Sequence, residues 1–178
     1  MFRLLEGKLV NLRIWEKEDM KLIAEWTNNP DFFDEFERLR QVSRADMEKF
    51  YDTLPPETRF FFIEKKDGTK VGAIGHYQVG KLLEIGYVLV PSERKKGYCT
   101  EAAKIMVDYL FLSKDIVRVQ AHTNVRNVGS QKVLENVGFK KEGIVRKSSF
   151  VRGEWRDSCL YSILREEWKE PKILTKTA

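Results

Sequence analysis

The chain has 178 residues, which suits one domain and leaves little room for two separate cores. Hydrophobic residues make up 42% of it and charged residues 33%, so a folded core with a solvated surface is expected. The formal net charge of +5 permits an anionic ligand without requiring nucleic acid. Two cysteines and two histidines, widely spaced, exclude a disulfide framework and make a metal site unexpected.

The N-terminal segment is too short and too charged for a signal peptide, and no apolar run reaches the roughly 18 residues of a membrane helix. A cytoplasmic location and no membrane partner are therefore expected. Alternating apolar residues over 10–14 predict a first strand, and spacing over 16–28 predicts a helix that ends before Pro30. A capping box at 43–46 opens a second helix that runs to about Leu54.

The middle of the chain is predicted to be a run of antiparallel strands. Residues 60–65 and 70–77 form a hairpin around the turn at Asp67-Gly68. After a further turn at Gly80, the nearly continuous apolar segment 82–90 is typical of a buried central strand.

A strand–loop–helix–strand unit follows. The loop 94–99 leads into a helix with apolar residues at helical spacing, and the segment 116–123 is a second apolar strand, so strands 82–90 and 116–123 should be parallel neighbours. The apolar face of this helix comprises Ala102, Ile105, Met106, Tyr109 and Leu110.

The last third is predicted to hold one more helix and two strands. The helix spans about 128–137, with Asn127 as its N-cap and Gly138 just past its end. Strands near 140–150 and 155–164 then meet at a turn.

The loop 94–99 has the features of a phosphate site. The first backbone N–H groups of a helix lack partners within the helix, and the helix dipole adds positive charge there. Gly97 allows close approach, while Arg94, Lys95 and Lys96 supply positive charge. The alternative is an ordinary basic loop. Neither a P-loop nor a dinucleotide fingerprint is present.

These residues resemble a known family. The stretch Arg94-Lys95-Lys96-Gly97-Tyr98-Cys99 is similar to the (Q/R)xxGx(G/A) acetyl-CoA motif of GCN5-related N-acetyltransferases (GNAT). Residues 84–87 and 100–102 resemble the branch that acetylates ribosomal-protein N-termini (RimJ/RimL type), and 127–139 resembles its NxxSxxV…GF signature. With the similar strand at 156–168, the resemblance covers about residues 8–168 in family order.

The resemblance implies an α/β fold: a mixed, twisted sheet of about seven strands, splayed between strands 4 and 5, with about four flanking helices. One domain would span 1–168, followed by a polar tail at 169–178. The central strand, here Tyr87 to Val90, would bind the pantetheine arm of acetyl-CoA through its backbone. Two asparagines past the next strand would reach the same arm, although Asn127 has the alternative role of a helix cap. The implied cofactor-binding residues are Val88, Leu89, Val90, Arg94, Lys95, Lys96, Gly97, Tyr98, Cys99, Thr100, Asn124 and Asn127.

One position departs from the motif, because Cys99 stands where the family usually has Gly or Ala. Cysteine is small and keeps its N–H, so pyrophosphate binding should survive. The thiol of CoA would lie far from this loop, which makes Cys99 a poor acyl carrier. Direct transfer within a ternary complex is therefore expected.

The resemblance also implies catalytic residues. Ser130 is the candidate general acid for the departing thiolate, and local bonding to the capping turn is its alternative role. Tyr161 is a less favoured substitute for it. Glu84 is the candidate base, acting directly or through water, or else an ordinary strand residue. Glu101 is predicted to be a helix-dipole partner, and His76 and His122 are predicted to be packed or hydrogen-bonded.

The expected function is acetylation of a primary amine by acetyl-CoA, with a protein N-terminal α-amine as the preferred acceptor. The acidic and aromatic segment 31–37 would form the acceptor wall, with Asp34, Glu35 and Glu37 attracting a cation. A small amine such as a polyamine or antibiotic is one alternative, and a non-catalytic acyl-CoA-binding module is another. No specific nucleic-acid partner is expected, and a homodimer is left open.

Overall fold

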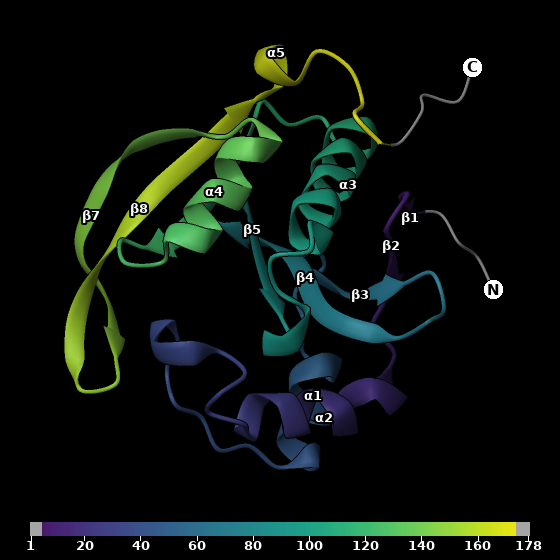
Figure 1. Cartoon of the computed structure of the whole chain (residues 1–178), viewed down its shortest axis with the longest axis vertical. Coiled ribbons are helices and arrows are strands. Elements are labelled where there is room, and N and C mark those ends of the chain that lie inside the picture. Colours follow the sequence, from purple (N-terminus) through teal and green to yellow (C-terminus); the bar gives the residue numbers. More distant parts are fainter. Residues whose placement is uncertain (1–4, 174–178) are drawn as a thin grey trace.

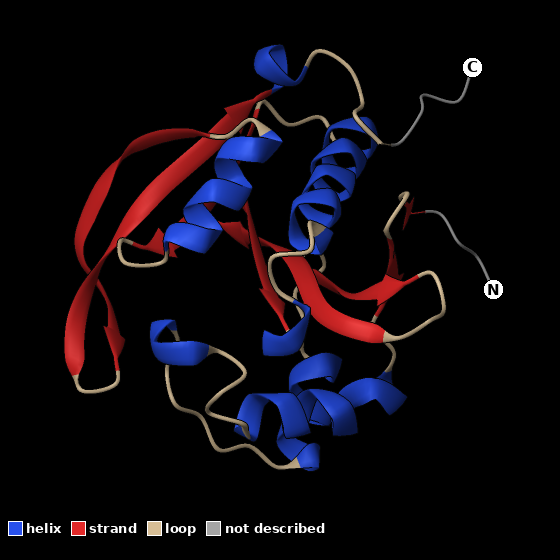
Figure 2. Ribbon diagram, in the orientation of Figure 1, coloured by secondary structure: helices blue, strands red, loops and turns tan. Residues whose placement is uncertain are grey.

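The computed structural model describes residues 5–173. Its centre is one mixed sheet of eight strands in the order β1-β2-β3-β4-β5-β6-β8-β7, with helices on both faces (Figures 1 and 2). The strands are β1 (Leu5–Glu6), β2 (Val10–Ile14), β3 (Arg59–Lys65), β4 (Lys70–Val79), β5 (Leu82–Leu89), β6 (Arg118–Asn124), β7 (Lys140–Val151) and β8 (Glu154–Leu164).

The helices begin and end close to the predicted residues. Ser43 caps the second helix by accepting a hydrogen bond from the backbone N–H of Asp46, and Asp46 completes the capping box. The helices are α1 (Met20–Asn28), α2 (Arg44–Asp52), α3 (Tyr98–Ser113), α4 (Val128–Val137) and α5 (Arg165–Trp168), with short 3₁₀ turns η1 (Lys17–Asp19), η2 (Asp34–Phe36) and η3 (Pro91–Glu93).

The sheet has one strand more than the seven expected, because the two-residue β1 pairs with β2. The turn between them is stabilised by a residue that is distant in the sequence. The carboxylate of Glu101 on α3 accepts hydrogen bonds from the backbone N–H groups of Lys8, Leu9 and Val10, at 3.0, 2.6 and 2.8 Å. Glu101 is buried, so its role is to hold this turn, and the prediction of a simple dipole partner was incomplete.

The two faces of the sheet carry separate hydrophobic clusters. Side chains alternate along a strand, so neighbouring residues of β5 face opposite sides. Leu83, Ile85 and Leu89 belong to the large cluster with α3 and α4, and Tyr87 packs against it. Val88 instead packs against the smaller cluster formed with α1. Even-numbered residues of β5 therefore face α1 and α2, and odd-numbered residues face α3 and α4.

The fourth and fifth predicted strands are β5 and β6 once the additional β1 is counted, and they diverge as predicted. They are parallel, and their register contains only two pairs, Leu83 with Val119 and Glu84 with Gln120. Beyond Glu84, β5 continues for five residues without a partner on that side. The result is a gap in the sheet between the carboxyl ends of β5 and β6, at the place where a ligand binds in many open α/β sheets.

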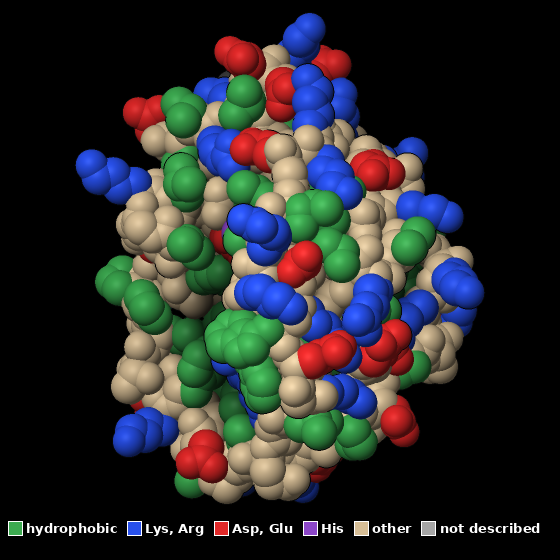
Figure 3. Space-filling view, turned by 90° about the vertical axis from the view of Figure 1, so that its left-hand side faces the viewer, with side chains coloured by type: hydrophobic (Ala, Val, Ile, Leu, Met, Phe, Trp, Pro, Cys, Tyr) green, Lys and Arg blue, Asp and Glu red, His purple; other side chains and the backbone are tan. Residues whose placement is uncertain are grey.

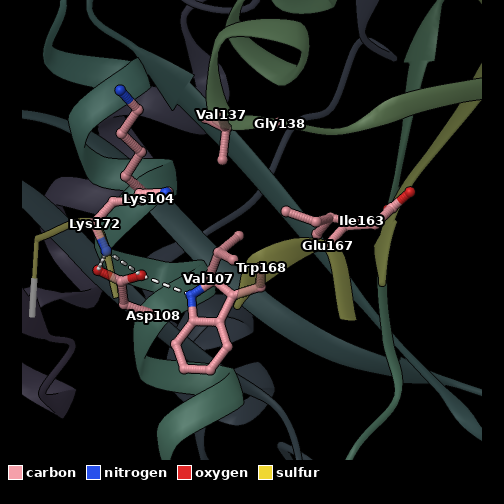
Figure 4. Close-up of a pocket in the computed structure, with 9 residues that line it drawn as sticks. All are labelled: Lys104, Val107, Asp108, Val137, Gly138, Ile163, Glu167, Trp168 and Lys172. Atoms are coloured by element: carbon pink, nitrogen blue, oxygen red, sulfur yellow. Dashed lines mark hydrogen bonds between the residues drawn. The ribbon is translucent and has the colours of Figure 1, made fainter. Parts of the chain in front are cut away.

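The start of the C-terminal tail docks on α3 (Figure 4). Asp108 is buried, and its carboxylate accepts hydrogen bonds from the indole N–H of Trp168 (2.9 Å) and from the backbone N–H groups of Lys172 and Ile173. Residues up to 173 thus contact the domain, whereas 174–178 of the predicted tail lie outside the described residues. Within residues 5–173, no helix is long and apolar enough to cross a membrane.

Candidate active site

The unpaired edge of β5 offers backbone groups to a ligand. Val90 N donates to Val71 O at 2.8 Å, and the antiparallel register with β4 is regular. Hydrogen bonding alternates along such a strand, so the even-numbered Val88 and Val90 direct their N–H and C=O groups to β4. Tyr87 and Leu89 direct theirs into the gap. Of the backbone contacts expected from Tyr87 to Val90, those of Tyr87 and of the Leu89 N–H are therefore open, whereas Leu89 O accepts from Arg94 and the groups of Val88 and Val90 face β4.

The loop after β5 forms a positively polarised helix start. Gly97 is the N-cap of α3 with φ +82°, a left-handed conformation that favours glycine. A Cβ placed there would find only the side chain of Leu9, at 3.7 Å, so the space beside Gly97 is open. The first intrahelical bond is donated by Glu101 to Gly97 O (3.1 Å), which leaves the N–H groups of Tyr98, Cys99 and Thr100 without an acceptor in the helix.

The three cationic side chains of this loop differ in their exposure and in their contacts. Lys95 is exposed with φ +62°, and Lys96 is exposed and pairs with Glu93 at 2.9 Å. Arg94 turns the other way, because its guanidinium donates to Leu89 O (3.3 and 3.2 Å) and Phe32 O (2.6 Å) and pairs with Asp34. The prediction of three cations around one phosphate is therefore corrected: the Arg94 side chain is committed to the segment 32–34.

The two asparagines shape the turn between β6 and α4. The Asn124 side chain accepts from Arg126 N at 2.9 Å, and the Asn127 side chain accepts from Ser130 N at 3.0 Å. The cap role of Asn127 is thus confirmed. It makes Ser130 the third residue of α4, close to the positive end of the helix dipole.

Ser130 lies against Tyr87 of β5. The phenol oxygen of Tyr87 is 3.0 Å from Ser130 Oγ and 3.1 Å from Ser130 O. Because Tyr87 faces α3 and α4, this contact joins β5 to the start of α4, which follows β6. Two hydroxyl groups therefore meet beside the gap between the two strands.

Glu84 lies on the opposite face, with α1 and α2. Its side chain is only 8% exposed, and it accepts hydrogen bonds from the Tyr77 hydroxyl (3.0 Å) and Gln120 Nε2 (2.9 Å). The Nδ1 atom of His122 lies 3.0 Å from Glu84 Oε1, while the side chain of His122 is 33% exposed. A buried carboxylate thus supports an accessible imidazole, as carboxylates do in catalytic dyads.

The segment 31–37 packs as a wall beside this face. Phe32 is buried and stacks on Trp26, with ring centroids 4.8 Å apart. Arg152, from the β7–β8 hairpin, donates to the carbonyl groups of Asp34 and Glu37, and Arg156 donates to that of Glu35. Figure 1 shows the hairpin beside η2.

The acidic side chains of this wall differ in their pairing. Asp34 pairs with Arg94, and Glu35 lies 3.9 Å from Arg156. Glu37 forms no ion pair with the described residues, and desolvation raises its pKa despite its solvent exposure. Burial, the charge of Glu84 and the hydrogen bond to Glu84 raise the pKa of Tyr77, and the charge of Glu37 acts in the same direction.

The β7–β8 hairpin exposes apolar side chains on the face shown in Figure 3. Phe150 and Trp155 contact each other edge to face, with centroids 5.8 Å apart, and each is about half exposed. Trp155 also borders an open depression with Lys147 and Glu154.

The structure adds site features that the sequence analysis did not identify: Tyr77, Gln120, the contact of the Tyr87 hydroxyl with Ser130 and the role of His122. Each is fixed by pairing across strands, which the sequence of one strand does not reveal. Tyr161 is fully buried and donates to Glu135 at 3.0 Å, which gives its hydroxyl a structural partner. His76 is packed, as expected, between the rings of Phe61 and Tyr109.

Comparisons with known proteins agree with this geometry. The family model described as the acetyltransferase (GNAT) domain matches residues 10–140. The Probable N-acetyltransferase YjcK of Bacillus subtilis (strain 168) is 31% identical, over 92% of this chain and 98% of that protein.

Solved structures agree as well. The spermidine N-acetyltransferase from Vibrio cholerae, in complex with CoA and spermine, has a TM-score of 0.81 at 21% identity, over 91% of this chain and 99% of that one. The ribosomal-protein-S5-alanine acetyltransferase from Vibrio fischeri has a TM-score of 0.77 at 22% identity, over 92% and 97%. At these identities the two structures show the shared fold alone. The chain belongs to the GNAT family and is an acetyltransferase.

Proposed function

We propose that the protein transfers an acetyl group from acetyl-CoA directly to a primary amine, and that the preferred acceptor is a protein N-terminal α-amine. GNAT acetyltransferases use acetyl-CoA, and one structural neighbour holds CoA. The observation that carries the proposal is the gap between β5 and β6, with the Ser130 hydroxyl on one face and the Glu84–His122 pair on the other.

Acetyl-CoA is the acyl donor, and the residues present fit it. The open space at Gly97 and the free N–H groups of Tyr98, Cys99 and Thr100 suit a pyrophosphate, with Lys95 and Lys96 supplying charge nearby. The backbone of Tyr87 and the N–H of Leu89 would bind the pantetheine arm, since Leu89 O already accepts from Arg94. Asn124 would face the same arm with its amide NH₂ group, since its oxygen is used in the turn.

The acyl group is proposed to pass straight to the amine. Burial, the main cause, raises the pKa of the Cys99 thiol, and the charge of Arg94 acts in the opposite direction. Cys99 therefore stays a buried, protonated thiol, which is a poor nucleophile.

Proton transfer is assigned to the two faces. Ser130, near the helix start, would donate to the departing sulfur. On the other face, Glu84 already accepts three hydrogen bonds, so we assign the proton of the acceptor ammonium group to His122, with Glu84 holding the ring. Nδ1 donating to Glu84 leaves the Nε2 lone pair available as a base.

The preference for an α-amine rests on charge. An α-amine has an ordinary pKa of about 7.7–8.0 and is partly neutral at pH 7.5, whereas a lysine amine is almost wholly protonated. A single modest base is then enough. A polyamine carries several positive charges, yet two of the four acidic residues in the wall, Asp34 and Glu35, lie against arginines of this chain.

A small cationic amine is the second candidate. Glu37 is exposed and forms no ion pair with the described residues, so its carboxylate is available to a cationic amine. A relative of this fold is a spermidine acetyltransferase.

One experiment separates the candidates. Release of free CoA is measured with a peptide bearing a free N-terminus, with the same peptide blocked there but containing lysine, and with spermidine. The highest kcat/KM is expected for the free N-terminus. Preference for spermidine or for the blocked peptide would reject the α-amine, and the absence of turnover with every amine would reject the transfer itself.

A further inference from the structure

Tyr87 contacts two oxygen atoms of Ser130 at once. Its phenol oxygen is 3.0 Å from Oγ and 3.1 Å from the backbone carbonyl oxygen. The two contacts come from one side chain on β5 and fix the position of the serine hydroxyl relative to the unpaired edge of that strand. The motif that identifies Ser130 contains no hint of this contact.

Counting protons shows what the pair can do. The phenol has one proton, and the carbonyl oxygen can only accept. If the phenol donates to the carbonyl, the serine must donate to the phenol, so the serine proton is occupied. If the phenol donates to Oγ, the serine proton is free to point toward a ligand. Both states share the same heavy-atom positions, so rotation about the two C–O bonds interconverts them.

We propose that Tyr87 is a positioning residue for Ser130: it holds Oγ in place and donates to it while Ser130 donates to the departing sulfur. The inference rests on the proposed function and deepens it. A hydroxyl that accepts one hydrogen bond becomes a better donor in the next, because hydrogen bonds in a chain polarise one another. The Tyr87 phenol thereby strengthens the donor without itself touching the substrate.

The surroundings of Tyr87 suit this role. Burial, as the main cause, raises the pKa of its hydroxyl, and nearby Cys99 and Tyr161 act in the same direction, whereas the bond to Ser130 opposes them. The phenol therefore stays protonated across the physiological range and always has a proton to donate.

Every proton in the transfer has a donor and an acceptor, and Tyr87 is never deprotonated. His122 takes the proton of the ammonium group and passes it to water. The acyl C–S bond then breaks as the C–N bond forms. The remaining proton moves from the amine nitrogen to Ser130 Oγ as the serine proton moves to sulfur, so serine and tyrosine both end protonated.

A double-mutant cycle tests the proposal. Ser130→Ala should lower kcat by about 10²–10⁴-fold, and Tyr87→Phe by about 10-fold, with the KM for acetyl-CoA changed less than about 2-fold. In the Ser130→Ala background, Tyr87→Phe should change kcat by less than about 2-fold, because its effect passes through the serine. Tyr109→Phe, which removes a phenol hydroxyl from the same core on α3, is the matched control and should leave kcat unchanged.

The outcomes separate this inference from the function on which it rests. If the wild type acetylates an amine but the two losses multiply, Tyr87 has only a structural role and the inference is overturned. An unchanged kcat for Tyr87→Phe overturns it as well. If the wild type acetylates none of the amines, the proposed function fails and this inference fails with it. Thermal unfolding of each variant identifies any loss that comes from misfolding.

Discussion

Arg94 and Asp34, sixty residues apart in the sequence, form an ion pair that joins the cofactor loop to the acceptor wall. The same guanidinium donates to Phe32 O in the wall and to Leu89 O at the end of β5. One side chain therefore links the strand proposed to bind pantetheine with the segment proposed to bind the amine. A change at Arg94 should affect the acceptor more than the acyl donor.

Replacing Arg94 with Gln tests this link. The variant loses charged hydrogen bonds worth about 1.5–3 kcal/mol each, so the wall should loosen and the KM for the acceptor should rise about 10-fold or more. The Kd for acetyl-CoA should stay within about 2-fold. Lys96→Gln is the control, since Lys96 is exposed in the same loop. If the affinity for acetyl-CoA falls instead and the KM for the acceptor is unchanged, Arg94 binds the phosphate and does not stabilise the wall.

Gly97→Val should weaken acetyl-CoA binding by at least about 10-fold. A β-branched residue is strained at φ +82°, and its side chain would fill the space proposed for the pyrophosphate. Gly68→Val is the matched control, because Gly68 has φ +86° with open space around it in the β3–β4 turn. Both variants should lose similar stability, and calorimetry should show lost affinity for Gly97→Val alone. If Gly97→Val and Gly68→Val bind acetyl-CoA with equal affinity, the loop 94–99 does not bind the pyrophosphate.

His122 and Glu84 should act as one unit in catalysis. His122→Gln and Glu84→Gln should each lower kcat by about 10²-fold, and the double variant should be little worse than either. Added imidazole should restore part of the activity of His122→Ala, because it can take the same proton. Full activity in His122→Gln with a large loss in Glu84→Gln would assign the base to the carboxylate instead.

His76 should make folding sensitive to acid. Burial, the main cause, together with the charge of Lys114, lowers its pKa from 6.5 to about 4, and both ring nitrogens lack a hydrogen-bond partner. The unfolded chain therefore binds a proton below pH 6.5 that the folded protein resists until pH 4. Stability should fall as the pH drops through this window, by up to about 3 kcal/mol from this group.

Urea unfolding of His76→Leu between pH 7 and pH 4 checks this expectation. The variant should lose less stability across the window than the wild type, because it has no imidazole to protonate. His122→Gln serves as the comparison, since His122 is accessible. An identical pH slope in wild type and His76→Leu would show that other groups cause the acid sensitivity.

Periodic and local features were predictable from the sequence. The capping box at Ser43, the Asn127 cap and the parallel β5–β6 pair with its gap all depend on nearby residues or on a family pattern, and all are present. The two-residue β1 was missed because it is too short for periodicity and depends on Glu101, more than 90 residues away.

Prediction of the site from the sequence was limited mainly by the unknown direction in which each side chain points. Arg94 has a positive charge in the right loop, but the carbonyl groups that bind it belong to residues 32 and 89, which only the fold brings together. Likewise, nothing in the sequence distinguishes His122 from an ordinary strand residue. Only the pairing of Glu84 with Gln120, two residues before His122 on β6, brings the carboxylate to the imidazole. Contacts across strands and loops therefore decided which candidate residues share a site.

The arginine contacts of the acceptor wall also set an order of events during synthesis. Residues 30–37 leave the ribosome early, yet their backbone carbonyl groups are bound by Arg94, Arg152 and Arg156, which follow up to about 120 residues later. Domains gain native contacts as the chain emerges from its N-terminal end. The wall can reach its final arrangement only after the β7–β8 hairpin has been made, so a nascent chain that already contains the cofactor loop still lacks a finished acceptor site.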